Sequence, residues 1–131
     1  MRRALTALAA ATLIAVAPVS AHHSFSAYYF EDQSVTLQGV IQEFQLRSPH
    51  ATVIFTSPDG EGRSRTYSAE WSSPRRLTRN GVTKDTLKPG DAVIITGNPG
   101  RNQADHRVRL LTFKRPKDGW SWGILENETF N

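Results

Sequence analysis

Histidine is the residue type in this chain that most strongly suggests a metal-binding or other chemical role. The 131-residue sequence holds four histidines, His22, His23, His50 and His106, and no cysteine. If the chain is cut after Ala21, His22 gains a free α-amine beside its imidazole, and such a pair of nitrogen ligands suits Cu(II). A third nitrogen from His23, His50 or His106 would complete a metal site. Copper is therefore the cofactor that this pattern suggests, and such a site could be redox-active.

A purely structural role for the same histidines stays open. In that interpretation His22 and His23 are solvated, His50 caps a turn and His106 lies on the surface. The sequence has no H-E-x-x-H metal motif, no G-x-S-x-G motif and no cysteine nucleophile. We therefore expect a binding protein and not an enzyme.

Residues 1–21 have the pattern of a secretory signal peptide. Two arginines precede the apolar run 4–19, and small residues follow up to Ala21. We expect cleavage after Ala21, a periplasmic location and no membrane span in the remaining chain. Loss of the two arginines halves the formal net charge of +4, which leaves little long-range attraction for nucleic acid. Binding of single-stranded nucleic acid through Tyr67 and Trp71 is a third hypothesis.

The stretch 35–50 predicts a long, bent strand. With a period of two, its apolar residues change phase after Gly39, from Val35 and Leu37 to Val40, Phe44 and Leu46. A glycine at such a point is typical of a β-bulge or a sharp bend. We expect the strand to end at a turn, Ser48-Pro49-His50, which places the histidine at the rim of the fold.

Four further strands and one short helix are expected. Alternating apolar residues predict strands at 51–57 and 65–71, and further apolar patterns predict strands at 92–97 and 107–113. Ser73 followed by Pro74 predicts the start of a helix, and Gly81 predicts its end. An N-terminal arm, 22–34, precedes the domain. A C-terminal tail, 117–131, carries Trp120 and Trp122, which could fold back on it.

This order of elements predicts an all-β, OB-like barrel over residues 35–116, with five antiparallel strands and the helix between the third and fourth. An open antiparallel sandwich is the alternative. In such a barrel the loops between strands 1 and 2 and between strands 4 and 5 lie on the ligand-binding side. The candidate ligand-binding residues are Arg47, His50, Asn98, Arg101 and His106. We predict a non-catalytic binding module for a small ligand or another periplasmic protein, with the arm as part of its binding surface.

Several motifs together resemble a known family. They are Ala21-His22-His23-Ser24-Phe25, Val35-Thr36-Leu37 with Gly39, Pro49-His50, and Leu87-Lys88-Pro89-Gly90-Asp91. This combination is similar to a family of small secreted bacterial proteins, a domain of unknown function (DUF 6152), over roughly residues 21–113. The family usually has Asn before Pro-His and an aromatic residue soon after it, where this chain has Ser48 and Ala51-Thr52. The resemblance implies a periplasmic protein of a Gram-negative bacterium and implies no activity.

Overall fold

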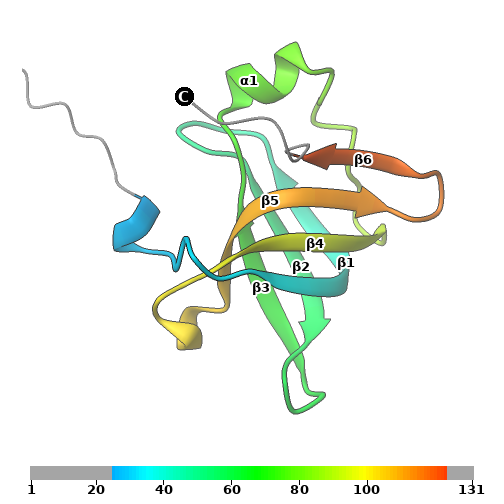
Figure 1. Ribbon diagram of the computed structural model, residues 1–131. Helices are drawn as coiled ribbons and strands as arrows, with labels where there is room; N and C mark the ends of the chain where they lie inside the picture. The colour runs from blue at the N-terminus through cyan, green and yellow to red at the C-terminus, as the bar shows by residue number, and fades with distance from the viewer. Residues whose placement is uncertain (1–24, 124–131) are drawn as a thin grey trace, which may run out of the picture.

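The computed structural model describes residues 25–123, and the predicted signal peptide, His22 and His23 lie outside this range. β-Strand is the main regular structure of the described chain (Figure 1). Its elements, in chain order, are η1 (Phe25–Ala27), β1 (Val35–Gln45), β2 (Thr52–Pro58), β3 (Ser64–Glu70), α1 (Pro74–Arg79), β4 (Ala92–Pro99), η2 (Gln103–Asp105), β5 (Arg107–Arg115) and β6 (Trp120–Gly123). The all-β prediction with one short α-helix is confirmed.

Five strands close into a barrel. The sheet order is β3-β2-β1-β4-β5-β6, and an additional pairing of β3 with β5 joins the ends of the five-strand ring. The OB-like barrel is thus confirmed, and the open sandwich is wrong. The prediction that all strands are antiparallel needs one correction, because β3 and β5 run parallel over Ser68–Glu70 and Arg107–Arg109. Five strands cannot alternate in direction all the way around a closed ring, so one neighbouring pair must be parallel.

Strand β1 serves both halves of the barrel. Its first part pairs with β4, its second part pairs with β2, and Val40 pairs with both. The predicted irregularity exists, but its predicted position is wrong, since the register shifts between Ile41 and Glu43. Ile41 is buried, whereas Val40 is 44% exposed. The inward and outward faces therefore keep their alternation past Gly39 and change only at Gln42.

Gly39 is required for a different reason from the one the sequence suggested. A Cβ atom built at this position would lie 2.2 Å from the backbone oxygen of Thr56 and 2.8 Å from the ring of Phe55. Gly39 is not among the glycines with positive φ. Glycine is needed here because β2 crosses β1 too closely for any side chain.

The core fills the barrel and continues under α1, which lies over one open end (Figure 1). Leu77 of α1 is fully buried, and Val82 and Leu87 of the following loop are buried with it. The predicted helix start is confirmed, because the Ser73 side chain accepts a hydrogen bond from the Arg76 amide at 3.4 Å. Strand β6 pairs with β5, so Trp120 and Trp122 pack against the core.

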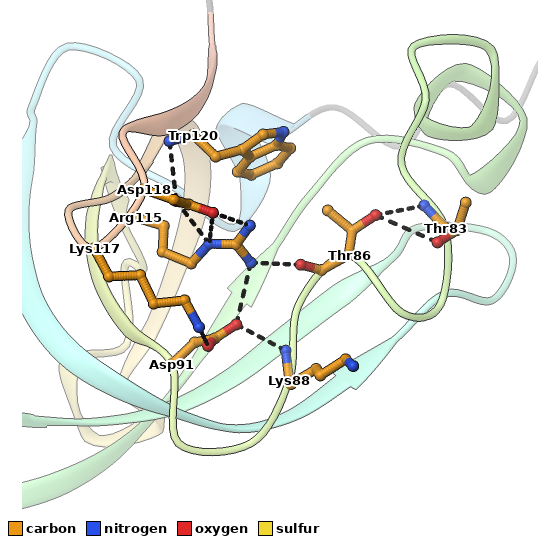
Figure 2. A network of polar contacts seen from close by, with 8 residues as sticks. All are labelled: Thr83, Thr86, Lys88, Asp91, Arg115, Lys117, Asp118 and Trp120. Atoms are coloured by element: carbon orange, nitrogen blue, oxygen red, sulfur yellow. Dashed lines mark hydrogen bonds and ion pairs between the residues drawn. The ribbon is translucent and has the colours of Figure 1, made fainter.

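A buried carboxylate ties the loop before β4 to the hairpin of β5 and β6 (Figure 2). Asp91 accepts hydrogen bonds from the Lys88 amide at 3.0 Å, from Arg115 at 3.2 Å and from Lys117 at 2.6 Å. Arg115 also donates to the carbonyl oxygen of Thr86 and to Asp118. The motif Leu87–Asp91, which contributed to the family resemblance, therefore has a structural role in this fold.

Burial of Asp91 by itself would raise the pKa of its carboxyl group. The hydrogen bonds from Lys117, the Lys88 amide and Arg115 outweigh that effect and hold the pKa below its ordinary value. The carboxylate is thus stabilised in its charged form inside the protein.

Within residues 25–123, no helix is long and apolar enough to cross a membrane.

Candidate functional site

The main candidate site is a cavity of about 310 Å³ beside the seam of the barrel. One edge of β5 pairs with β3 as far as Arg109 and with β6 from Thr112 onward, and Leu110 and Leu111 belong to neither ladder. Beyond Glu70 the chain leaves β5 and leads into α1. The cavity forms in the resulting gap. Its lining consists of Phe25, His50, Glu70, Trp71, Ser72, Ser73, Arg76, Arg109, Leu110, Leu111 and Trp122.

A set of polar side chains converges on Glu70 at one wall of this cavity. The Nδ1 atom of His50 contacts one carboxylate oxygen of Glu70. The other oxygen accepts a hydrogen bond from Tyr29 at 2.6 Å and a longer one from Arg107 at 3.4 Å. Because Glu70 holds Nδ1, the Nε2 atom of His50 is the ring nitrogen left for a further partner.

Tyr29 is the buried member of this set. Burial raises the pKa of its hydroxyl group above the ordinary value, and the hydrogen bond to Glu70 and the charge of that carboxylate raise it further. Tyr29 therefore stays protonated at neutral pH and donates to Glu70. This contact connects the N-terminal arm to the end of β3.

Phe25 connects the arm to the same wall. Its ring stacks on the ring of His50, with centroids 5.4 Å apart and planes 25° apart. The guanidinium group of Arg109 lies 4.0 Å from the centre of the Phe25 ring, and Arg109 also pairs with Glu31 at 2.6 Å. The arm thus contributes an aromatic ring to the cavity and a counter-charge to Arg109.

Trp71 forms part of the inner wall. It is only 3% exposed, and it packs against Phe113 and Trp122. Its indole Nε1–H has no hydrogen-bond acceptor among residues 25–123. Buried donors are nearly always paired in folded proteins, so this enclosed nitrogen is an exception within the core.

The structure separates the ligand-binding residues that the sequence grouped together. Only His50 lines the main cavity. Arg101 lines a smaller cavity of about 130 Å³ beside the loop after β4. Arg47 is exposed and bonds to Gln45, and the His106 ring packs edge-on against Tyr67.

Two of these residues hold the arm in place. Asn98 is 4% exposed and donates to the carbonyl oxygens of Gln33 and Glu31. Arg101 donates to the carbonyl oxygen of Ser26 at 2.7 Å and lies over the ring of Phe30. These contacts hold the arm along the barrel, and neither Asn98 nor Arg101 lines the main cavity.

The four histidines do not form a metal site within the described chain. His50 and His106 have different neighbours, and across residues 25–123 no group of three or more histidine, aspartate or glutamate side chains could share a metal ion. His22 and His23 lie outside that range, so the predicted metal site of the four histidines stays a prediction.

Sequence reasoning missed Glu70, Arg109 and the role of Phe25. One signal for Glu70 was available, since the turn at Pro58-Asp59-Gly60 fixes the register of the hairpin that β2 and β3 form. That register pairs Glu70 with Thr52, and Thr52 lies two residues after His50 in the sequence. The approach of Arg109 and Phe25 had no such local signal, because it depends on how β5 and the arm pack.

Fold and site together define a small closed β-barrel with a ligand-sized, mixed polar and aromatic cavity at its seam. The chain belongs to a family of unknown function, DUF6152, whose sequence model matches residues 9–109. This membership confirms the resemblance seen in the motifs. No curated protein and no solved structure gives a significant match to the chain.

Proposed function

We propose that this protein is a small, non-catalytic binding module whose ligand site is the cavity between η1, the start of α1 and β5. The observation that carries the proposal is the cavity of about 310 Å³ itself, whose wall combines aromatic rings, such as Phe25 and Trp122, with the polar pair of His50 and Glu70. Cavities of this size, with aromatic walls and a few polar groups, are typical of small-molecule sites. The signal-peptide pattern of residues 1–21 supports a periplasmic place of action.

A fragment screen by NMR tests this proposal. We expect bound fragments to shift the backbone amides of Glu70, Trp71 and Leu111, which line the cavity, and to leave the turn around Gly60 unchanged. The cavity-filling variant Ser72→Phe should abolish those shifts while its remaining spectrum stays that of a folded protein. If fragments of neutral, cationic and anionic types all fail to shift the cavity residues, the cavity is not a binding site.

Cu(II) binding is the second candidate, and one observation favours it. A carboxylate on Nδ1 orients a histidine so that Nε2 can bind a metal ion, which is the arrangement of many metal sites. Glu70 holds His50 in this way. In the sequence His23 lies two residues before Phe25, and the ring of Phe25 stacks on His50.

Electron paramagnetic resonance of Cu(II) complexes, with a competing chelator, tests the copper proposal on protein that begins at His22. We expect His50→Asn to change the spectrum and weaken binding at least tenfold, and His106→Asn to do neither. Asparagine suits position 106, where φ is +46°. A spectrum and affinity unchanged by His50→Asn, or by one extra residue before His22, would remove the corresponding nitrogen from the site.

Binding of single-stranded nucleic acid stays a weaker hypothesis. Trp71 is buried in the core, and Tyr67 packs against Phe55 and His106. Neither ring therefore offers the open face on which a base would stack.

A further inference from the structure

We propose that the ligand of the main cavity is a compact, uncharged aromatic alcohol of the phenol type, an inference that rests on the binding function proposed above. The charges that line the cavity are the first reason. The carboxylate of Glu70 has three partners among the neighbouring side chains, and Arg109 pairs with Glu31 at 2.6 Å. Arg76 also has an interaction of its own. The charges of the lining are therefore matched, and the cavity favours a neutral ligand.

The protonation pattern of His50 is the second reason. The Tyr29 hydroxyl and the Arg107 guanidinium group both donate to Glu70, and Nδ1 of His50 contacts the same carboxylate. Because an ionised carboxylate only accepts hydrogen bonds, the proton of the neutral imidazole lies on Nδ1. The Nε2 atom then has a free lone pair, so it accepts a hydrogen bond from a ligand that has a donor.

This acceptor can be reached by a ligand. The His50 side chain lines the cavity and is 32% exposed. Its Nε2 atom has no partner among residues 25–123 and, unlike the indole nitrogen of Trp71, it is not enclosed. The same is true of the hydroxyl group of Ser72, which lines the same cavity. A ligand hydroxyl group suits this wall, since it can donate to Nε2 of His50 and accept from Ser72.

The apolar part of the lining is the third reason. Phe25, Leu110, Leu111 and Trp122 make up much of the remaining wall, and Leu111 and Trp122 are only half-buried. An aromatic ring attached to the hydroxyl group would cover this surface and release water from it, and it would gain further from contact with the indole ring. The cavity volume of about 310 Å³ is at the small end of ligand sites, which favours a compact molecule.

Phenol and anisole are matched probes, because anisole keeps the ring and the oxygen atom but has no hydrogen to donate. NMR titration at pH 8, on protein kept free of metal ions by a chelator, measures both affinities. Phenol is uncharged at this pH, since the pKa of a phenolic hydroxyl group is about 10. We expect phenol to shift the backbone amides of Glu70, Trp71 and Leu111 and to bind about tenfold more tightly than anisole. Benzoate should bind no more tightly than phenol, because the charges of the wall are matched.

Two histidine variants locate the acceptor. His50→Phe removes Nε2 and keeps an aromatic ring to stack on Phe25. We expect it to weaken phenol about tenfold and to change anisole less than about twofold, so that the preference between the probes is lost. His106→Asn is the control, because His106 packs against Tyr67 and does not line the cavity. It should leave the preference unchanged.

The ring ¹⁵N shifts of His50 in the wild-type protein check the tautomer without any substitution. At pH 8 we expect the proton on Nδ1 and a lone pair on Nε2, and we expect phenol to shift the Nε2 signal as hydrogen bonding to a lone pair does. A proton on Nε2, in the other tautomer or in the charged ring, would overturn the proposal. This measurement and the comparison of phenol with anisole decide the matter even if His50→Phe does not fold.

The outcomes separate this inference from the function on which it rests. If anisole binds the cavity as tightly as phenol, or if His50→Phe keeps the preference for phenol, the hydroxyl group is not recognised and the ligand class is wrong, while the binding site stands. A tighter affinity for benzoate than for phenol would likewise refute only the neutral class. If phenol shifts residues around Arg101 and none around Trp71, both the ligand class and the location of the site are wrong. If no aromatic probe shifts any cavity residue while fragments of other chemistry do, only the present inference is overturned.

Discussion

Replacing Asp91 with asparagine tests whether the polar network in Figure 2 stabilises the barrel. The substitution keeps the size of the side chain and removes its charge. The Asp91 side chain is 7% exposed, and its partner Arg115 is 12% exposed. Lys117, at 62% exposed, can return to water. The net loss is therefore dominated by the charged hydrogen bond to Arg115, and we expect Asp91→Asn to cost about 2 kcal/mol.

Urea denaturation at pH 7 measures this cost, read from the midpoint with an unchanged slope. For a domain of this size, about 2 kcal/mol corresponds to a fall in Tm of roughly 10 °C. Asp118→Asn is the matched control, because Asp118 binds the same arginine from a more exposed position. Its effect should be clearly smaller, as is usual for ion pairs at the surface. Equal effects of the two variants would refute the argument from burial.

The pH dependence gives a second, independent result. The folded-state pKa of Asp91 is lowered, so its charge stabilises the fold fully above the unfolded-state pKa of about 3.9. This contribution is lost as the pH falls below that value and through the lower folded-state pKa. The difference between wild type and Asp91→Asn should therefore shrink as the pH falls from 7 to 3. A difference that stays constant would show that the charge of Asp91 is not what stabilises the protein.

Three further predictions concern the strand crossing and the arm. Gly39→Ala should destabilise the barrel by roughly 2 kcal/mol or more in urea, because its Cβ would lie 2.2 Å from a backbone oxygen of β2, while Gly60→Ala, with open space around it, should be nearly neutral. Asn98→Ala should cost about 1–2 kcal/mol and speed hydrogen exchange of the Phe30 amide, because the arm loses its buried amide contact; unchanged exchange there would contradict this role. In an ultraviolet pH titration, the Tyr29 hydroxyl should ionise above the ordinary tyrosine pKa of about 10, and Tyr29→Phe should remove that late step; loss of an earlier step instead would contradict the assigned environment.

The sequence by itself determined the five strands of the barrel and the start of the helix, whereas β6 formed where only a C-terminal tail was expected. Those features depend on near neighbours, such as the alternation of apolar residues in 51–57 or the Ser73-Pro74 pair, and the physical preferences of these residues act locally. The order of elements was enough to give the barrel. It did not give the position of the bulge, because Val40 is apolar but faces outward, and its neighbours on β2 and β4 decide which face it occupies.

The tertiary structure alone decided the candidate site. His50 was recognised from its residue type, but its meeting with Glu70 depends on hairpin register, and the approach of Phe25 and Arg109 depends on the docking of the arm. The sequence pattern placed Asn98 and Arg101 in a polar loop, and we therefore predicted that they bind a ligand. In the structure both side chains donate hydrogen bonds to carbonyl oxygens of the arm. The cavity itself exists because β3 and β6 leave Leu110 and Leu111 unpaired between them on one edge of β5. Such a gap results from three strands distant in sequence, so no local pattern of residues encodes it.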